Sequence, residues 1–246
     1  MEKRVAIITG AAQGIGLAIA KRLAGMGMSV AISDINMGRT EAQANLLAAA
    51  GYDVFAVHGD VSNVESIKQM LTLTAEHFGH IDILVNNAGI LFSTAVEEIT
   101  EKEWDTLMAV DLRGAFFCMQ KAIPYLKNRP HPRIINISSV AGQMGSYASG
   151  MAYVAAKGGM LSLTYGMSRR LAPYRITVNA VCPGTIETDI IKQWPPEKIA
   201  ELTANIPLGH LGRSDDIAAA VAFLAQEDTD FITGEAMSVN GGMYCG

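Results

Sequence analysis

Tyr153 and Lys157 stand four residues apart in a run with helical spacing, so a phenol and an ammonium share one face of the predicted helix. A cation beside a tyrosine favours the phenolate and lowers a pKa that starts at about 10, which would let the phenol exchange protons near neutral pH. Ser138 and Ser139, at the end of a predicted strand upstream, add hydroxyl groups. A helical Tyr–Lys pair is more often an ordinary surface pair, but its coincidence with these serines favours proton-transfer chemistry.

A glycine-rich turn follows the first predicted strand and opens a helix, over residues 9–16. Glycines there let the backbone turn sharply and let a pyrophosphate approach the N–H groups at the helix N-terminus, where the helix dipole favours negative charge. A tight strand-to-helix turn of small residues is the structural alternative. The residues expected to bind a dinucleotide here are Gly10, Gln13, Gly14, Ile15 and Gly16.

An acidic residue ends the second predicted strand, and another follows the third. Asp34 lies eighteen residues after Gly16, where an acid accepts hydrogen bonds from the adenosine ribose hydroxyls and repels a 2′-phosphate. No Arg or Lys occupies the glycine turn or directly follows Asp34, and Arg39 is the one nearby exception, so we expect NAD rather than NADP. Asp60 and Val61 could hold the adenine, although Asp60 alone is more typical of a plain turn acid.

Short runs rich in Val and Ile alternate with helical patterns along the whole chain, which is typical of βαβ units and a parallel sheet. We therefore predict one α/β domain over residues 1–246, a doubly wound parallel sheet of about seven strands with helices on both faces. The predicted strands are Val5–Thr9, Ser29–Asp34, Asp53–His58, Ile81–Asn86, Arg133–Ser138, Ile176–Cys182 and Ala236–Val239. In such a sheet ligands bind at the carboxyl ends of the strands, which is where the serines, the glycine turn and Asp34 fall.

Helix starts are marked by capping residues, and one long segment breaks the alternation. The motifs Ser62-x-x-Glu65 and Thr100-x-x-Glu103 both read as capping boxes, and residues 214–216 put acids in a first helical turn. Residues 187–212 show neither helical nor strand periodicity. Because loops of this length are usually functional, we expect this segment to be a substrate loop or lid inserted in the domain.

Composition excludes several classes of partner. The 246 residues are 50% hydrophobic and 17% charged, with a formal net charge of −5 at pH 7, and no basic cluster exceeds Arg169–Arg170. Such a chain offers no field that would attract nucleic acid. No run of 18 apolar residues occurs, so we expect no membrane span and a cytoplasmic protein.

The cysteines and histidines suggest neither disulfides nor a metal. Cys118, Cys182 and Cys245 are odd in number, far apart and without Cys-x-x-Cys spacing, which fits a reducing compartment. The five histidines form no metal-ligand pattern, so no metal site is expected.

Taken together, the motifs resemble those of the classical short-chain dehydrogenase/reductase family, and the resemblance covers essentially the whole chain. They are Thr9-Gly10-x-x-x-Gly14-x-Gly16, Asn86-Asn87-Ala88-Gly89 after the fourth predicted strand, Ser139, Tyr153-x-x-x-Lys157, and Pro183-Gly184 after the sixth. The resemblance implies a Rossmann-type fold in which Tyr153 is the general acid/base and Ser139 holds the substrate oxygen. Lys157 would bind the nicotinamide ribose and lower the pKa of Tyr153.

The same resemblance assigns further residues to the cofactor. Asn87 would stand beside the cofactor ribose, and Gly89 in the same motif and Pro183 after the sixth predicted strand are also expected to bind the cofactor. The Ile186 backbone and the Thr188 hydroxyl would fix the nicotinamide carboxamide.

One residue departs from the family pattern. Where the family usually has an asparagine that helps to hold a water in the proton relay, this sequence has Asp111. An ionised carboxylate accepts hydrogen bonds but cannot donate them, and near Lys157 it could compete for the charge that should act on Tyr153. We expect Asp111 to keep a working but altered relay; the alternative is that its side chain merely supports a helix kink.

The expected function is NAD(H)-dependent interconversion of a small or medium secondary alcohol, or a polyol, and its ketone. An alternative is an NADPH-dependent 3-oxoacyl-thioester reductase, which would dock an acidic carrier; for that docking the chain offers only Arg129, Arg133, Arg169 and Arg170. A non-catalytic dinucleotide-binding sensor is a third, less favoured reading, since a pure binder does not need the Tyr153 phenol. The apolar helices expected over residues 103–126 and 153–171, with the similarity to the family, favour a homotetramer.

Overall fold

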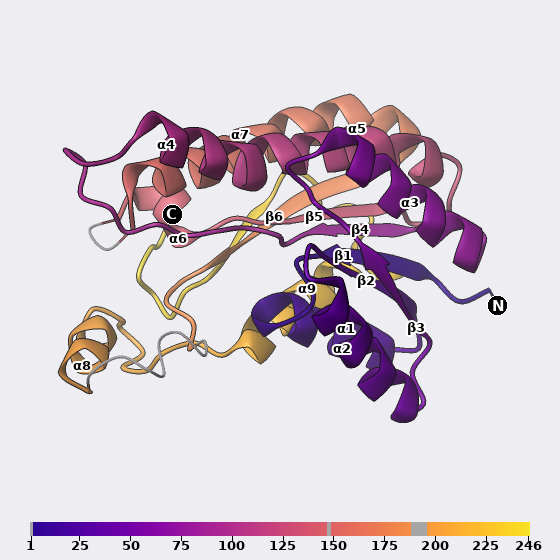
Figure 1. Cartoon of the computed structure of the whole chain (residues 1–246), viewed down its shortest axis with the longest axis horizontal. Coiled ribbons are helices and arrows are strands. Elements are labelled where there is room, and N and C mark those ends of the chain that lie inside the picture. The colour runs from indigo at the N-terminus through magenta and orange to yellow at the C-terminus, as the bar shows by residue number, and fades with distance from the viewer. Residues whose placement is uncertain (1, 147–148, 188–195) are drawn as a thin grey trace.

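The computed structural model of the chain describes residues 2–146, 149–187 and 196–246. Seven strands of these residues form one sheet, all parallel, in the order β3-β2-β1-β4-β5-β6-β7 (Figure 1). They are β1 (Val5–Thr9), β2 (Ser29–Asp34), β3 (Val54–His58), β4 (Ile83–Asn86), β5 (Arg133–Ile137), β6 (Thr177–Pro183) and β7 (Ala236–Val239). Every bound lies within two residues of the predicted one, and the predicted doubly wound sheet is confirmed.

Helices cover both faces of the sheet, with α3, α4, α5 and α7 on one side and α1, α2 and α9 on the other (Figure 1). The helices are α1 (Gly14–Gly25), α2 (Met37–Ala49), α3 (Val64–Phe78), α4 (Glu101–Met108), α5 (Ala115–Leu126), α6 (Val140–Met144), α7 (Met151–Leu171), α8 (Pro196–Ala204) and α9 (Ser214–Leu224). A π-helical turn, η1 (Ala109–Gly114), joins α4 to α5, and 3-10 turns η2 (Ala172–Tyr174) and η4 (Glu227–Thr229) follow α7 and α9.

The strands read as unbroken apolar runs because both of their faces are buried. Successive side chains of a strand point to opposite faces, so Ile8 and Ile32 belong to the core cluster that includes residues of α1 and α9. Ile7 and Ala31 belong to the cluster that includes residues of α3 and α5. All four side chains are fully buried, and hydrophobic burial on both faces holds the three layers together.

The direction of winding reverses beside β1, which pairs with β2 on one side and with β4 on the other. In open parallel sheets this reversal leaves a crevice at the carboxyl ends of the strands, where ligands bind. The glycine-rich turn, Asp34, Asn87 and Ser139 all follow strand ends on this edge.

Two local predictions differ from the structure. The N-cap of α3 is Asn63, whose Oδ1 accepts from the N–H groups of Glu65 and Ser66, so the predicted Ser62 capping box is wrong. Ser62 and Asn63 are adjacent, and the Asn63 amide oxygen reaches two of the free N–H groups at the start of the helix. Thr100 does cap α4, with its Oγ1 3.2 Å from the Glu103 nitrogen.

The described part of the segment 187–212 is also more regular than its sequence suggested, while residues 188–195 lie outside the described residues. It contains the helix α8, which lies apart from the sheet in Figure 1. Its two ends are joined, because Ile186 and Gly212 form a parallel β-bridge and the Glu187 N–H donates to the Gly212 carbonyl at 2.7 Å. Nearby prolines and the short helix obscured the helical period.

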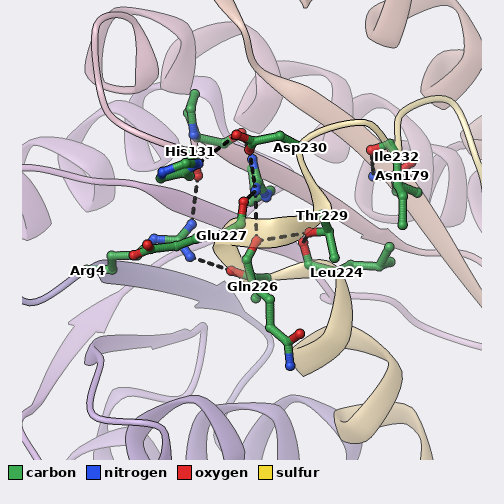
Figure 2. Close-up of polar contacts among 12 residues, drawn as sticks. Arg4, His131, Asn179, Leu224, Gln226, Glu227, Thr229, Asp230 and Ile232 are labelled. Carbon is green, nitrogen blue, oxygen red and sulfur yellow. Dashed lines mark hydrogen bonds and ion pairs between the residues drawn. The ribbon is translucent and has the colours of Figure 1, made fainter.

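Two arginines secure the opposite, amino-end edge of the sheet, where Figure 2 shows Arg4 beside His131, Gln226 and Asp230. Arg133, which is fully buried, donates to the Gln226 carbonyl at 2.7 Å and to the Asp230 carboxylate at 2.6 Å. Arg4 donates to the carbonyls of Ala225 and His131. These guanidiniums satisfy carbonyls at the carboxyl end of α9, where the helix dipole favours positive charge.

No helix within the described residues is long and apolar enough to cross a membrane. In the same part of the chain, no group of three or more His, Cys, Asp or Glu side chains could hold a metal ion.

Candidate active site at the carboxyl edge of the sheet

The structure brings the predicted Ser139, Tyr153 and Lys157 to one place, where β5 ends and α7 begins. Ser139 has extended backbone and caps α6, and its Oγ accepts from the Ala141 N–H at 3.1 Å. Tyr153 lies in the first turns of α7 and is half-buried, and Lys157 follows one turn later with its Nζ 5.4 Å from the centre of the phenol ring. Helix α6 packs against α7 so closely that a Cβ on Gly142 would lie 2.6 Å from the Lys157 carbonyl carbon.

Lys157 is buried and surrounded by acceptors. Its side chain is 5% exposed, its Nζ donates to the Ile137 carbonyl at 3.1 Å, and the Asp111 Oδ2 lies 3.2 Å away. Burial by itself would lower the pKa of Lys157, but the attraction of Asp111 and of the Tyr153 oxygen outweighs it and leaves this pKa raised. The ammonium is therefore held in its charged form beside the phenol.

Asp111 reaches Lys157 from the π-helical turn η1 and is fully buried. Its Oδ1 accepts from the Ile90 N–H at 2.8 Å, which fixes the chain that follows β4, while its Oδ2 faces the lysine. Gly89 must be small, because a Cβ there would lie 2.8 Å from that Oδ2. The carboxylate thus contacts two donors, and the π-turn agrees with the helix-distortion alternative; an altered relay remains a prediction.

The glycine-rich turn is tied to the end of β4 by Asn87, whose Nδ2 donates to the Thr9 and Gly10 carbonyls at 2.9 Å each. Gly10 has φ +63°, and a Cβ there would lie 2.7 Å from the Ala88 Cα. A Cβ on Gly16 would lie 2.4 Å from the Gly10 oxygen. Two separate constraints, backbone conformation and close approach, therefore require glycine in this turn.

The start of α1 fits a dinucleotide pyrophosphate. Across the described ranges no side chain caps the N-terminus of this helix, and Gln13 at the N-cap position has extended backbone. The first N–H groups of a helix have no partner inside it, so those of α1 are available to an anion. The glycines predicted for this role, together with Gln13 and Ile15, surround that helix end.

Asp34 ends β2 beside the glycine turn. Its Oδ2 lies 3.3 Å from the Ala12 nitrogen, and its Oδ1 accepts from the Asn36 N–H at 3.0 Å. Arg39, in the first turn of α2, donates to the Gln13 side-chain oxygen. Both Asp34, expected to favour NAD, and Arg39, the nearby arginine that could favour NADP, therefore contact this part of the site.

The remaining predicted cofactor residues are placed with different outcomes. Asp60 is engaged locally, since its Oδ1 accepts from the Ser62 N–H at 2.9 Å and from its hydroxyl at 2.6 Å, as in a turn. Val61 is buried, with its carbonyl against Gly114. Of the residues predicted near the end of β6, Pro183 is the last residue of the strand and Ile186 forms the bridge to Gly212. Thr188 lies outside the described residues.

Sequence reasoning named Thr9 and Ser138 but not the contacts through which their hydroxyl groups hold the site together. Thr9 Oγ1 accepts from the N–H groups of Asn87 and Ala88 at 3.1 Å each. Ser138 Oγ donates to the Lys157 carbonyl at 2.9 Å. Each is the immediate neighbour of a predicted residue, but nothing in the local pattern reveals a partner so far away along the chain.

Comparisons with known proteins place the chain in a family. The family model described as "Enoyl-(Acyl carrier protein) reductase" matches residues 10–244. A 3-oxoacyl-[acyl-carrier-protein] reductase FabG of Staphylococcus aureus is 41% identical over 97% of each chain. The (2S)-[(R)-hydroxy(phenyl)methyl]succinyl-CoA dehydrogenase subunit BbsD of Thauera aromatica is 37% identical over 98% of this chain and 97% of the relative.

Solved structures agree with these sequence matches. A short-chain dehydrogenase/reductase of Serratia marcescens superposes with a TM-score of 0.92 at 34% identity, over 98% of this chain and 97% of that one. The predicted resemblance is thus confirmed along nearly the whole length. The chain belongs to the classical short-chain dehydrogenase/reductase family.

Proposed function

We propose that this oxidoreductase interconverts 3-oxoacyl and 3-hydroxyacyl thioesters with NAD(H). The observation that carries the substrate class is that the FabG and BbsD relatives, both similar to this chain over nearly its full length, are named for acyl groups held on an acyl carrier protein or on CoA. The thioester alternative therefore takes precedence over the secondary alcohol and ketone that we first expected. As a family member, the chain binds a nicotinamide dinucleotide.

The residues around the start of α7 have complementary roles in this proposal. During reduction, the Ser139 hydroxyl donates a hydrogen bond to the 3-oxo oxygen, and Tyr153 gives that oxygen its proton. The buried ammonium of Lys157 stabilises the phenolate that remains. A bound nicotinamide dinucleotide would supply the hydride for reduction and accept it in oxidation, when Tyr153 takes the proton back.

Asp34 supports NAD(H) as the preferred form of the cofactor. Its carboxylate ends β2 at the position where the ribose hydroxyls would donate, and it would repel a 2′-phosphate. Arg39 is the competing feature, but it donates to the Gln13 side chain. We therefore assign the cofactor preference to Asp34 and expect NADH to be used better than NADPH.

Apolar side chains beside the reacting groups suit an acyl chain. Leu91 is 56% exposed, and its neighbour Phe92, like Tyr153, packs against the small buried cluster that includes Ala152 at the start of α7. Met144, at the end of α6, is 55% exposed. Helix α8 and the bridge between Ile186 and Gly212 follow β6, and we expect this part of the chain to contribute to the substrate site as well.

Few arginines of the chain are available to bind an acidic carrier of the acyl group. Two of the four arginines considered for an acidic carrier are engaged inside the chain: Arg133 is fully buried, and Arg129 binds Asp82 at 2.7 Å and Glu2 at 3.0 Å. Arg169 and Arg170 are exposed at the carboxyl end of α7. The experiment below therefore compares a CoA ester with a carrier-protein ester.

The test measures NADH consumption by the purified protein with acetoacetyl-CoA and with acetoacetyl-acyl carrier protein. A panel of ketones and secondary alcohols, and NADPH in place of NADH, are run in parallel. We expect thioester reduction with NADH that falls at least about a thousandfold in Tyr153→Phe, because the proton donor is gone. Faster turnover of a simple ketone would restore the alcohol reading. Tight NADH binding without any turnover would favour the sensor.

The cofactor assignment has its own test. Asp34→Asn removes the negative charge while keeping the shape, so kcat/KM for NADPH should rise relative to that for NADH. A wild type that prefers NADPH would contradict the role given to Asp34 and leave the thioester assignment intact.

We also propose that the protein is a homo-oligomer through one helical face. A cavity of about 980 Å³ lies between the α4–η1–α5 stretch and α7. Phe116, Leu112 and Leu163 are among its lining residues, and a partner helix would bury them. A tetramer by light scattering is expected, and a monomer at micromolar concentration would contradict it.

A further inference from the structure

Asn136, near the carboxyl end of β5, joins three of the elements that lead to or carry predicted site residues. Its side chain is fully buried. Its Oδ1 accepts from the Asn86 Nδ2 on β4 at 2.8 Å, and its Nδ2 donates to the Thr164 Oγ1 on α7 at 2.9 Å. Asn86 directly precedes Asn87 in the chain. The Asn136 amide therefore connects three elements: β4, which leads to Asn87 and its contacts with the glycine turn; β5, which leads to Ser139; and α7, which carries Tyr153.

A second pair of contacts joins the same strand and helix nearer the site. Ser138, two residues after Asn136 and so on the same face of the chain, donates through its Oγ to the Lys157 carbonyl at 2.9 Å. The Lys157 Nζ donates to the Ile137 carbonyl at 3.1 Å. Because Thr164 follows Lys157 by two helical turns, α7 is attached to β5 at two separate heights.

We infer that Asn136 and Thr164 are positioning residues that fix how far α7 stands along β5, and thereby where Tyr153 lies relative to Ser139. The inference rests on the proposed function, since it gives Tyr153 and Ser139 their roles in the reaction. Apolar packing alone tolerates small sliding movements, whereas a buried amide with partners on two elements is satisfied in one arrangement. Proton transfer needs that arrangement, because a displacement of about 1 Å can cost about a hundredfold in rate.

Thr164 offers the cleaner substitution because valine keeps its shape. Its Oγ1 also donates to the Met160 carbonyl one turn earlier at 2.9 Å, so Thr164→Val removes a helix back-bond as well as the partner of Asn136. Thr74 on α3 supplies a matched control: it is equally buried and its Oγ1 donates to the Met70 carbonyl at 2.8 Å. Thr74→Val removes the same type of hydroxyl and back-bond away from the site.

The experiment compares kcat, KM and the unfolding midpoint of wild type, Thr164→Val, Thr164→Ser and Thr74→Val. We expect Thr164→Val to lower kcat about tenfold. The KM for the cofactor should stay within about twofold, because the glycine turn and Asp34 belong to other strands. Thr164→Ser, which keeps the hydroxyl, should recover most of kcat. Thr74→Val should lower the unfolding midpoint while leaving kcat near that of wild type.

The inference fails if Thr164→Val loses stability but keeps its kcat, because the contact would then be structural only. Kinetics are measured on the best substrate of the panel, so a wild type that reduces ketones but not thioesters refutes the proposed substrate and still tests Thr164. Hydrogen exchange needs no turnover: peptides from the first turns of α7 should exchange faster in Thr164→Val than in Thr74→Val. Equal exchange in the two variants would also overturn the inference.

Discussion

Asp111→Asn replaces one of the two charges in the buried pair with Lys157 while keeping the shape of the side chain. The carboxylate has two acceptor oxygens that face two donors, the Ile90 N–H and the Lys157 ammonium. An asparagine has one acceptor oxygen, so its NH2 group must face one of those donors. The substitution therefore removes a charge and also leaves one buried donor without an acceptor.

The separation sets the size of the effect. At 3.2 Å, and with an effective dielectric constant of about 20, the attraction between the two charges is about 5 kcal/mol. Part of this offsets the cost of burying both ions, and removing one partner of such a pair usually costs about 3–5 kcal/mol. Because the asparagine keeps one hydrogen bond, we expect the free energy of unfolding to fall by about 3 kcal/mol. For a chain of this length, the Tm should fall by about 6–12 °C.

The pH dependence follows from the raised pKa of Lys157. A lysine whose pKa is higher in the folded state than its unfolded value of about 10.4 adds stability that is complete below that pH and is lost as the pH rises through the folded pKa. The stability difference between wild type and Asp111→Asn should be constant between about pH 6 and pH 9 and narrow above about pH 10.4. Without Asp111, burial acts unopposed by its charge and lowers the pKa of Lys157, so the alkaline limb of turnover should move to lower pH.

The assay pairs thermal unfolding with the pH profile of kcat. Asp228→Asn is the matched control, since Asp228 is exposed near the opposite edge of the sheet and undergoes the same change of charge. An Asp111→Asn protein with the Tm and pH profile of the Asp228→Asn control would refute both the strength assigned to the pair and the altered relay.

Three further outcomes follow from the structure. Gly16→Ala places a Cβ 2.4 Å from the Gly10 oxygen, so the Kd for NADH should rise at least about tenfold by fluorescence titration, and unchanged binding would show that the turn can relax. Arg133→Met leaves buried carbonyls without a donor and should lower the free energy of unfolding, measured in urea, by about 3 kcal/mol. The kcat should stay unchanged, because the arginine lies at the edge of the sheet away from the site, and a fall in kcat would contradict this. Burial raises the pKa of Cys118 to about 12 and that of Cys182 to about 11, whereas Cys245 is exposed. A thiol reagent at pH 8 should therefore label only Cys245 in the folded chain and all three cysteines after unfolding. Rapid labelling of a second thiol in the folded chain would refute this.

Local sequence signals predicted the helices and strands well because they depend on neighbours along the chain. Val- and Ile-rich runs bounded by turns predicted every strand to within two residues, and Thr100 predicted the start of α4. Where two adjacent residues could both cap, as at Ser62 and Asn63, the pattern could not choose between them. Helix α8 was missed since its prolines and short length conceal the period.

The sequence by itself determined the fold class, the glycine turn and the residues expected to do the chemistry, because each depends on spacing within one element or one turn. Tertiary structure alone decided which of these groups touch: that Asp111 faces Lys157, that Asn87 holds the glycine turn, and that Asn136 joins β4, β5 and α7. The physical reason is that these contacts join residues distant in the chain, and a pattern of neighbours carries no information about how strands and helices are arranged around a buried polar group.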